Sequence, residues 1–114
     1  LERRQWTTPA ETPVQDSPFH TFLAIILNKT IAAHSAAEQG IAIAQNNLGA
    51  MYAMGAGVLK DYVYAHMWGN LAATNGIENG KKLRDFVAKT MTPSQFETAQ
   101  RLARECVRKK YKGC

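Results

Sequence analysis

The sequence predicts an all-α protein built from antiparallel helix-turn-helix repeats, an α-solenoid that ends in a capping helix. Three observations lead to this prediction. Apolar residues recur at helical spacing in five segments, and no segment sustains the alternation of a strand. Gly, Asn-Gly and Thr-Pro breaks separate these segments. A short motif also recurs after 36 residues, which is typical of stacked helical repeats.

The 114 residues fit one domain, and its first part differs from the rest. Residues 1–18 hold Pro9, Pro13 and Pro18 among polar residues, which predicts an extended arm or linker. Trp6 either anchors this arm in a groove or stays partly exposed without a role. Residues 19–114 are expected to form the helical repeat domain, with its cap at 92–112.

The first helix is expected over Phe19–Gln39, with Gly40 as its left-handed C-terminal cap. Its recurring positions are Leu23, Ile26, Leu27, Thr30 and Ile31. The longest apolar run, Phe22–Leu27, lies between His20 and Lys29. It is shorter than the ~18 residues of a membrane span. We therefore expect it to be a core element.

Two helices follow, separated by a glycine-rich turn. One is expected over Ile41–Met54, with an apolar face of Ala44, Leu48, Met51 and Tyr52. The other is expected over Tyr62–Thr74, with an inner stripe of Ala65, Trp68, Leu71 and Ala72. Asp61 is its expected N-cap, because a carboxylate there can accept backbone N–H groups of the first turn.

The last two helices complete the predicted domain. The fourth is expected over Ile77–Lys89, with Leu83, Phe86 and Val87 as its apolar face. The fifth opens with a capping box, in which Thr92 is the N-cap, Pro93 the first helical residue and Gln95 the reciprocal partner. Its apolar face holds Phe96, Ala99, Leu102, Ala103, Cys106 and Val107.

The recurring motif marks one complete repeat. Ala36-Ala37-Glu38-Gln39-Gly40 returns as Ala72-Ala73-Thr74-Asn75-Gly76. Between these marks stand the repeat-core positions Ala44, Leu48, Tyr52, Gly55, Gly57, Ala65, Trp68 and Ala72. Small residues let two helices approach closely, large ones fill the space between them, and glycines take backbone angles that other residues avoid. Residues 36–76 closely resemble the Sel-one-like repeat, a relative of the tetratricopeptide repeat.

The flanks depart from this pattern. A shift of 36 residues puts Ala32 in the place of Trp68, and Arg84 in the place of Leu48. Only one complete unit is therefore present, and its core is completed either by the flanking helices or by another copy. The segment from Lys89 to Glu105 is similar to the terminal cap of bacterial members. The resemblance implies a bacterial origin and an array that stops here.

Charge is uneven along the chain. Residues 81–114 carry ten Lys or Arg and three acids, whereas residues 1–80 carry four bases and six acids. Arg101, Arg104 and Arg108 form a basic stripe on the last helix. This stripe is either a solvated helix face or a site for an acidic partner. Tyr111 is the single aromatic residue interleaved with the basic residues of 101–112, so a nucleic-acid stacking platform is not predicted.

No constellation for catalysis is evident, so we expect neither an enzyme, nor a cofactor, nor a metal site. His20, His34 and His66 lack the spacing of metal ligands. His66 is expected to be a structural histidine that makes one hydrogen bond. Cys106 and Cys114 either form a disulfide bond or leave Cys106 as a buried free thiol.

The resemblance implies a protein-protein interaction scaffold, with a partner polypeptide bound on the concave surface. The expected contacts are Asn46, Ala50, Met54 and Tyr62, supported by the side-chain amides of Gln45, Asn46 and Asn47. Self-association and anion or nucleic-acid binding through the basic last helix are the alternatives. Because bacterial members are often exported, a periplasmic or secreted location is favoured over a cytoplasmic one.

Overall fold

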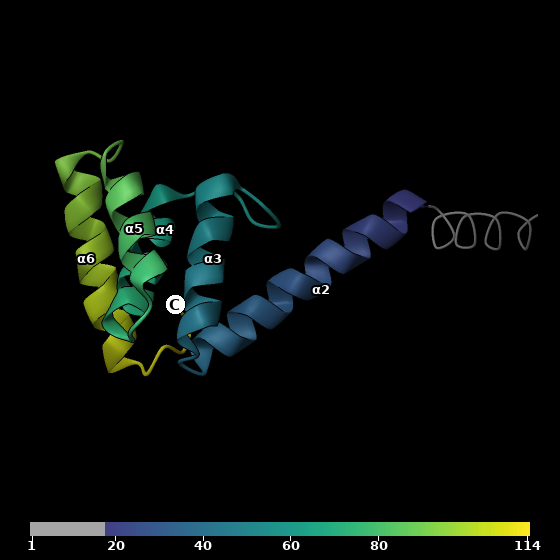
Figure 1. The fold of residues 1–114 in the computed structure, drawn as a ribbon, viewed down its shortest axis with the longest axis horizontal. Helices are drawn as coiled ribbons and strands as arrows, with labels where there is room; N and C mark the ends of the chain where they lie inside the picture. Colours follow the sequence, from purple (N-terminus) through teal and green to yellow (C-terminus); the bar gives the residue numbers. More distant parts are fainter. Residues whose placement is uncertain (1–17) are drawn as a thin grey trace, which may run out of the picture.

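The computed structural model describes residues 18–114, which form five helices and no strand (Figure 1). The helices are α2 (Pro18–Glu38), α3 (Ala42–Met54), α4 (Tyr62–Thr74), α5 (Glu78–Ala88) and α6 (Pro93–Arg108). The predicted all-α fold class is confirmed. The prediction of an extended arm, including the alternatives for Trp6, lies outside the described residues.

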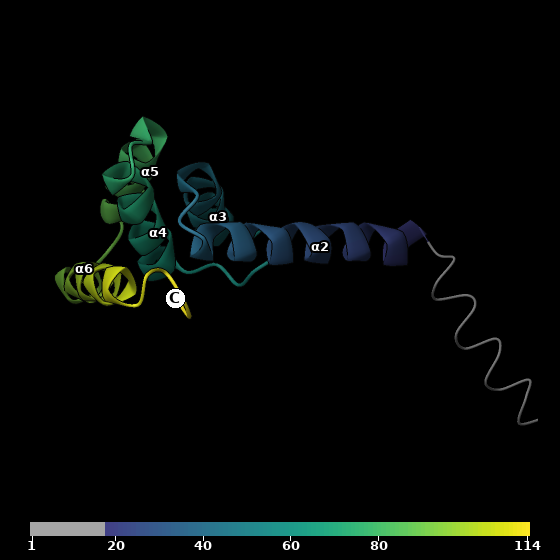
Figure 2. The ribbon, with the colours of Figure 1, turned by 90° about the horizontal axis from the view of Figure 1, so that it is seen from below.

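Helix α4 lies at the centre of the bundle. It packs against α3 on one side and against α5 and α6 on the others, while α3 also contacts α5. The long helix α2 contacts α3 through its C-terminal part and then extends away from the other helices (Figures 1 and 2). No helix in this described part of the chain is both long and apolar enough to cross a membrane.

The turns form where the sequence places glycine and capping residues. Gly40 and Gly55 have φ angles of 84° and 71°, in the left-handed region that favours glycine. The Asp61 carboxylate accepts a hydrogen bond from the Tyr64 backbone N–H at 3.1 Å, and α4 begins and ends at the predicted residues. The capping box is also present, because Thr92 and Gln95 each accept the other's backbone N–H.

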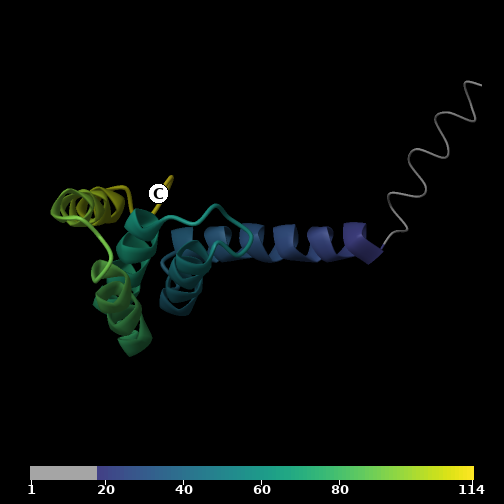
Figure 3. The same ribbon diagram turned by 90° about the horizontal axis from the view of Figure 1, so that it is seen from above.

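The core lies between α3, α4 and α6. Trp68 on α4 and Leu48 on α3 are completely buried, with Cys106 of α6 beside them. Cys106 is bonded to Cys114, so of the two alternatives for the cysteines the structure has the disulfide. After α6, residues 109–114 turn back toward the end of α2 (Figure 3).

Some residues expected on apolar faces are exposed instead. Phe86 on α5 has 67% of its surface exposed, because Gly80, Leu83 and Val87 form the face of that helix that is turned toward the bundle. Ile31 is 66% exposed, although the neighbouring Thr30 hydroxyl donates to the Gly57 carbonyl at 3.4 Å, so Ile31 lies on the outward face of α2. The prediction that Phe22–Leu27 is a core element is wrong for Ile25, which is about half exposed.

Candidate protein-interaction surface

One face of α3 carries the surface expected to meet a partner. Asn46, Ala50 and Met54 are four residues apart, so they follow one another along a single stripe of the helix. Met54 is 69% exposed, whereas Asn46 and Ala50 are half-buried. The stripe therefore becomes more accessible toward the C-terminal end of α3.

Tyr62 stands at the same end of the helix pair as Met54. The Asp61 backbone N–H donates to the Tyr52 carbonyl at 3.0 Å, which holds the start of α4 beside the last turn of α3. Tyr62 is half-buried, and the Lys60 ammonium lies 5.1 Å from its ring centroid. This cation–π contact leaves part of the ring accessible at the edge of the surface.

Sequence reasoning missed Ile43 as a member of this surface. Ile43 is 64% exposed, and it stands eleven residues before Met54. Because a helix turns about 100° per residue, positions 43 and 54 point within about 20° of each other, about 16 Å apart along the axis. Exposed Asn47 lies between them on the same face. The helical register of the sequence would have placed Ile43 on this face, if apolar residues had been included among the candidate surface positions.

The side-chain amides on α3 do not all face a partner. Gln45 was expected to support partner binding, but it is completely buried. Its amide donates to the Ala37 carbonyl at 3.3 Å and its amide oxygen accepts from the Asn75 side chain at 2.8 Å. Both ends of Gln45 are therefore used inside the fold. The Asn46 amide oxygen is also buried and has no partner among the described residues.

An aromatic cluster joins the first three described helices. The Tyr52 and Tyr64 rings stack with centroids 5.3 Å apart, and the Tyr52 hydroxyl lies 3.4 Å from His34 Nε2. Burial, together with the nearby Tyr64 and Asp61, raises the pKa of Tyr52 above its ordinary value. Tyr52 thus stays a neutral hydroxyl that holds α2, α3 and α4 together.

His66 lies inside the bundle without a polar partner. It is 1% exposed, and neither of its ring nitrogens has a hydrogen-bond partner among the described residues, so the expected single hydrogen bond is wrong. The Phe96 ring packs edge-on at 5.0 Å instead. Burial, reinforced by the Arg84 charge, lowers the pKa of His66. In the part of the chain that is described, no group of three His, Cys, Asp or Glu side chains gathers as metal ligands would.

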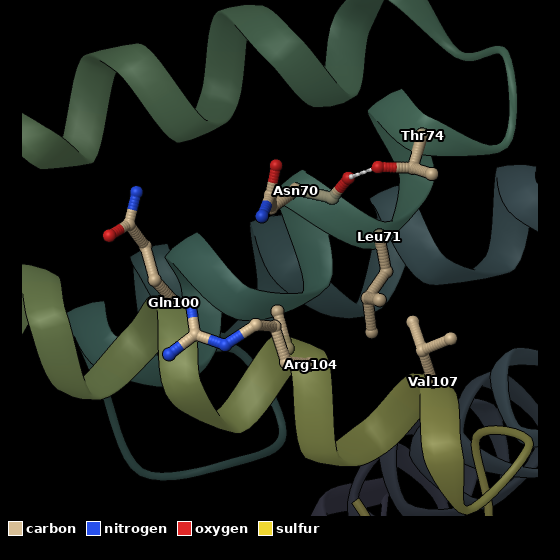
Figure 4. A pocket seen from close by; sticks show the side chains of 7 residues that line it. Asn70, Leu71, Thr74, Gln100, Arg104 and Val107 are labelled. Atoms are coloured by element: carbon tan, nitrogen blue, oxygen red, sulfur yellow. Dashed lines mark hydrogen bonds between the residues drawn. The ribbon is translucent and has the colours of Figure 1, made fainter.

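The basic stripe of α6 divides into residues with different surroundings. Arg101 donates to the Glu105 carboxylate at 3.0 Å, one turn along the same helix. Arg108 is exposed in the last turn. Arg104 instead lies at the rim of a groove between α4 and α6 with a volume of about 260 Å³ (Figure 4). The groove is lined by Asn70, Leu71, Thr74, Gln100, Ala103, Arg104 and Val107.

Comparison with known proteins relates this chain to a solved structure of known fold. That structure is the crystal structure of a protective antigen present in uropathogenic Escherichia coli strains, and it displays an SLR fold, the fold of Sel-one-like repeats. The sequences are 37% identical and the TM-score is 0.68. The match covers 72% of this chain and 18% of the antigen's chain. This chain is a relative of the Sel-one-like repeat proteins. No protein-family model and no curated protein matches it.

The Sel-one-like repeat explains where the repeat-core positions lie. Leu48, Ala65, Trp68 and Ala72 are completely buried. Leu48 and Trp68 belong to the core cluster, where Ala44 and Tyr52 pack partly buried beside them, whereas Ala72 lies against Gly80 of α5. Gly55 and Gly57 are exposed, so they serve the repeat through their positive φ angles rather than through packing.

Proposed function

We propose that the chain is a protein-interaction module that binds a partner polypeptide along α3. The observation that carries the proposal is the pair of exposed apolar side chains, Ile43 and Met54, on one face of that helix. Stacked helix pairs present the first helix of each pair on their concave side, and such surfaces bind extended segments or helices. Helical repeat folds of this kind typically act as scaffolds rather than as enzymes.

The chemistry of the surface indicates the kind of partner. Ile43 and Met54 offer two apolar contacts about three helical turns apart, with Asn47 and half-buried Ala50 between them. Burial of two such side chains contributes about 1.5–3 kcal/mol each at an interface. A partner helix with two apolar residues at the matching interval fits this arrangement.

Site-specific photocrosslinking tests the surface. A photoreactive phenylalanine analogue is placed at Met54 or, as a control, at Phe86, an equally exposed apolar residue on α5. We expect a defined crosslinked protein from position 54. With that protein purified, Ile43→Glu and Met54→Glu should each weaken binding at least tenfold by calorimetry. If Phe86→Glu abolishes binding of the partner while both α3 variants still bind it, the proposal is wrong.

Self-association is the second candidate, because α2 leaves the bundle with large apolar residues exposed. Ile31 is 66% exposed on this projecting helix. A second copy that covers it would form a dimer whose population depends on concentration. Light scattering from low to high micromolar concentration should then show a rising mass that Ile31→Lys abolishes. A constant monomer mass rules this candidate out.

We also propose an oxidising compartment such as the periplasm, because disulfide bonds persist where thiols are not kept reduced. The Cys106–Cys114 bond supports this location. Thiol alkylation in intact bacteria should leave both cysteines unlabelled until a reductant is added. Labelling without reductant would contradict the proposal.

A further inference from the structure

We propose that the groove between α4 and α6 binds a short peptide segment in which an acidic side chain stands two residues from an aliphatic one. This site is separate from the α3 surface, because α4 lies between α3 and α6 (Figures 1 and 2). The proposal rests on the donors at one end of the groove, the apolar side chains at the other, and the spacing between them.

One end of the groove presents N–H donors. Arg104 makes no hydrogen bond or ion pair to any residue that the structure describes, and the same holds for the Gln100 side chain. The Asn70 amide oxygen accepts from Arg84 Nη1 at 3.1 Å, so its NH₂ group is turned toward α6 (Figure 4). Guanidinium and amide donors that converge in this way suit a carboxylate.

Charge favours an acidic ligand at this end. None of the residues that line the groove is acidic, and Arg104 is exposed there. Arg101 is matched by Glu105 one turn away, whereas Arg104 and Arg108 have no ion pair among the described residues. Of these two cations, Arg104 is the one that lines the groove.

The other end of the groove is apolar. Leu71 of α4 and Val107 of α6 point toward each other (Figure 4), and Ala103 of α6 also lines the groove. Leu71 and Ala103 are buried, whereas Val107 is half exposed, so an entering aliphatic side chain would cover it. The expectation from sequence that Val107 belongs to the core is therefore corrected: it forms a wall of the groove.

The spacing of the two ends selects the ligand. Arg104 and Val107 are three residues apart on one helix, a separation of about 5–6 Å between their Cβ atoms, and the Arg104 side chain extends from there toward Gln100, away from Val107 (Figure 4). Alternate side chains of an extended peptide lie about 6.6 Å apart on the same face. A Glu-x-Leu segment therefore reaches both ends at once, whereas a phosphate or an oligonucleotide would use only the polar end.

Titration of ¹⁵N-labelled protein with short capped peptides tests the groove. The probe is Ac-Gly-Glu-Ser-Leu-Gly-NH₂, and its controls carry Gln for Glu or Ala for Leu. We expect the side-chain NH₂ signals of Asn70 and Gln100 to shift with the probe. Each control peptide should bind at least fivefold more weakly, and Arg104→Ala should weaken the probe by a similar factor.

Matched variants keep the test decisive. Arg101→Ala removes a charge from the same helix that is already paired, so it should change the peptide affinity less than twofold. Arg104→Lys keeps the charge without the bidentate donors, and its peptide affinity should fall between those of the parent and Arg104→Ala.

The proposal fails if the Gln peptide binds equally well, or if Arg104→Ala retains full affinity. It also fails if inorganic phosphate or a single-stranded oligonucleotide shifts the Asn70 and Gln100 signals more strongly. If the peptide shifts only signals from α3, the proposal for the groove is wrong and the proposal for the α3 surface is unaffected.

Discussion

Gly49, Gly69 and Gly80 set how closely the helices of this chain approach one another. A Cβ atom at Gly49 would lie 2.9 Å from Leu83 Cδ2 and 3.2 Å from the Ala65 carbonyl. A Cβ atom at Gly80 would lie 2.7 Å from the Gly69 carbonyl and 2.8 Å from the Ala73 nitrogen. Backbone atoms cannot move aside as a flexible side chain can, so Gly80 is the stricter requirement.

Gly80→Ala is expected to destabilise the protein by about 1–3 kcal/mol, because α5 must move away from α4 to admit the methyl group. Urea unfolding followed by circular dichroism measures the change. Asn79→Ala is the control, since this neighbour on α5 is exposed and alanine favours the helix. Equal stability of Gly80→Ala and the parent would show that the contact of α4 with α5 is loose.

His66 makes the stability depend on pH. Burial and the Arg84 charge lower the pKa of His66 in the folded state, and the weaker effect of Asp85 opposes them. The His66 ring packs on Phe96 rather than on a hydrogen-bond acceptor. The unfolded chain binds a proton near pH 6.5, whereas the folded chain resists it. Stability is therefore retained above pH 6.5 and lost as the pH falls below that value.

His66→Leu should remove this part of the acid sensitivity. Midpoints of thermal unfolding at pH 7, 6 and 5 are compared between the parent and the variant, because other groups titrate equally in both. We expect a smaller drop between pH 7 and pH 5 in the variant. Parallel curves for the two proteins would mean that the folded chain accommodates a protonated His66.

At the scale of elements, the residues after α6 connect parts of the fold that are distant in sequence. The Gly113 backbone N–H donates to the Glu38 carboxylate at 2.9 Å, at the end of α2. The Asn75 side chain donates to the Tyr111 hydroxyl at 3.2 Å, at the end of α4. The Cys106–Cys114 disulfide closes this tail onto α6. The tail thus holds the ends of α2, α4 and α6 at one end of the bundle.

Reduction of the Cys106–Cys114 bond should lower the free energy of unfolding by about 2–3 kcal/mol, from the chain entropy of a closed loop of this size. Urea unfolding with and without a phosphine reductant measures the loss. In Cys114→Ser the reductant should have no effect. An unchanged midpoint for the reduced parent would show that the hydrogen bonds of the tail suffice.

At the scale of the whole molecule, α4 is the element on which the others depend. It packs against α3, α5 and α6, and its residues Ala65, Met67, Trp68 and Leu71 are all buried. Repeat proteins usually share stability among neighbouring units, and the described part of this chain holds one complete unit. The described part of the chain therefore concentrates its packing on one helix.

Trp68→Ala is expected to cost about 3–5 kcal/mol, a large share of the 5–15 kcal/mol typical of a folded domain. Far-ultraviolet circular dichroism during urea unfolding is the measurement, since it does not depend on the lost indole. Phe86→Ala removes an exposed ring from α5 and should change stability by less than about 0.5 kcal/mol. Similar losses for both variants would mean that the core is not centred on α4.

The sequence by itself determined the all-α class, the positions of the turns and the repeat. Those features depend on local chemistry: Asp61 and Thr92 cap their helices, and Gly40 and Gly55 take positive φ angles, whatever the rest of the chain does. Helical periodicity also placed Trp68 and Leu48 on the buried faces.

Only the tertiary structure decided which of the remaining residues are covered. Phe86, Ile31 and Val107 carry the same periodic signal as core residues, yet the crossing of the helices leaves them exposed. The α4–α6 groove joins Asn70 to Arg104, which are 34 positions apart, so no local pattern could have predicted it. Burial depends on where neighbouring helices lie, and that is settled by close packing across the whole bundle rather than by the order of residues along one helix.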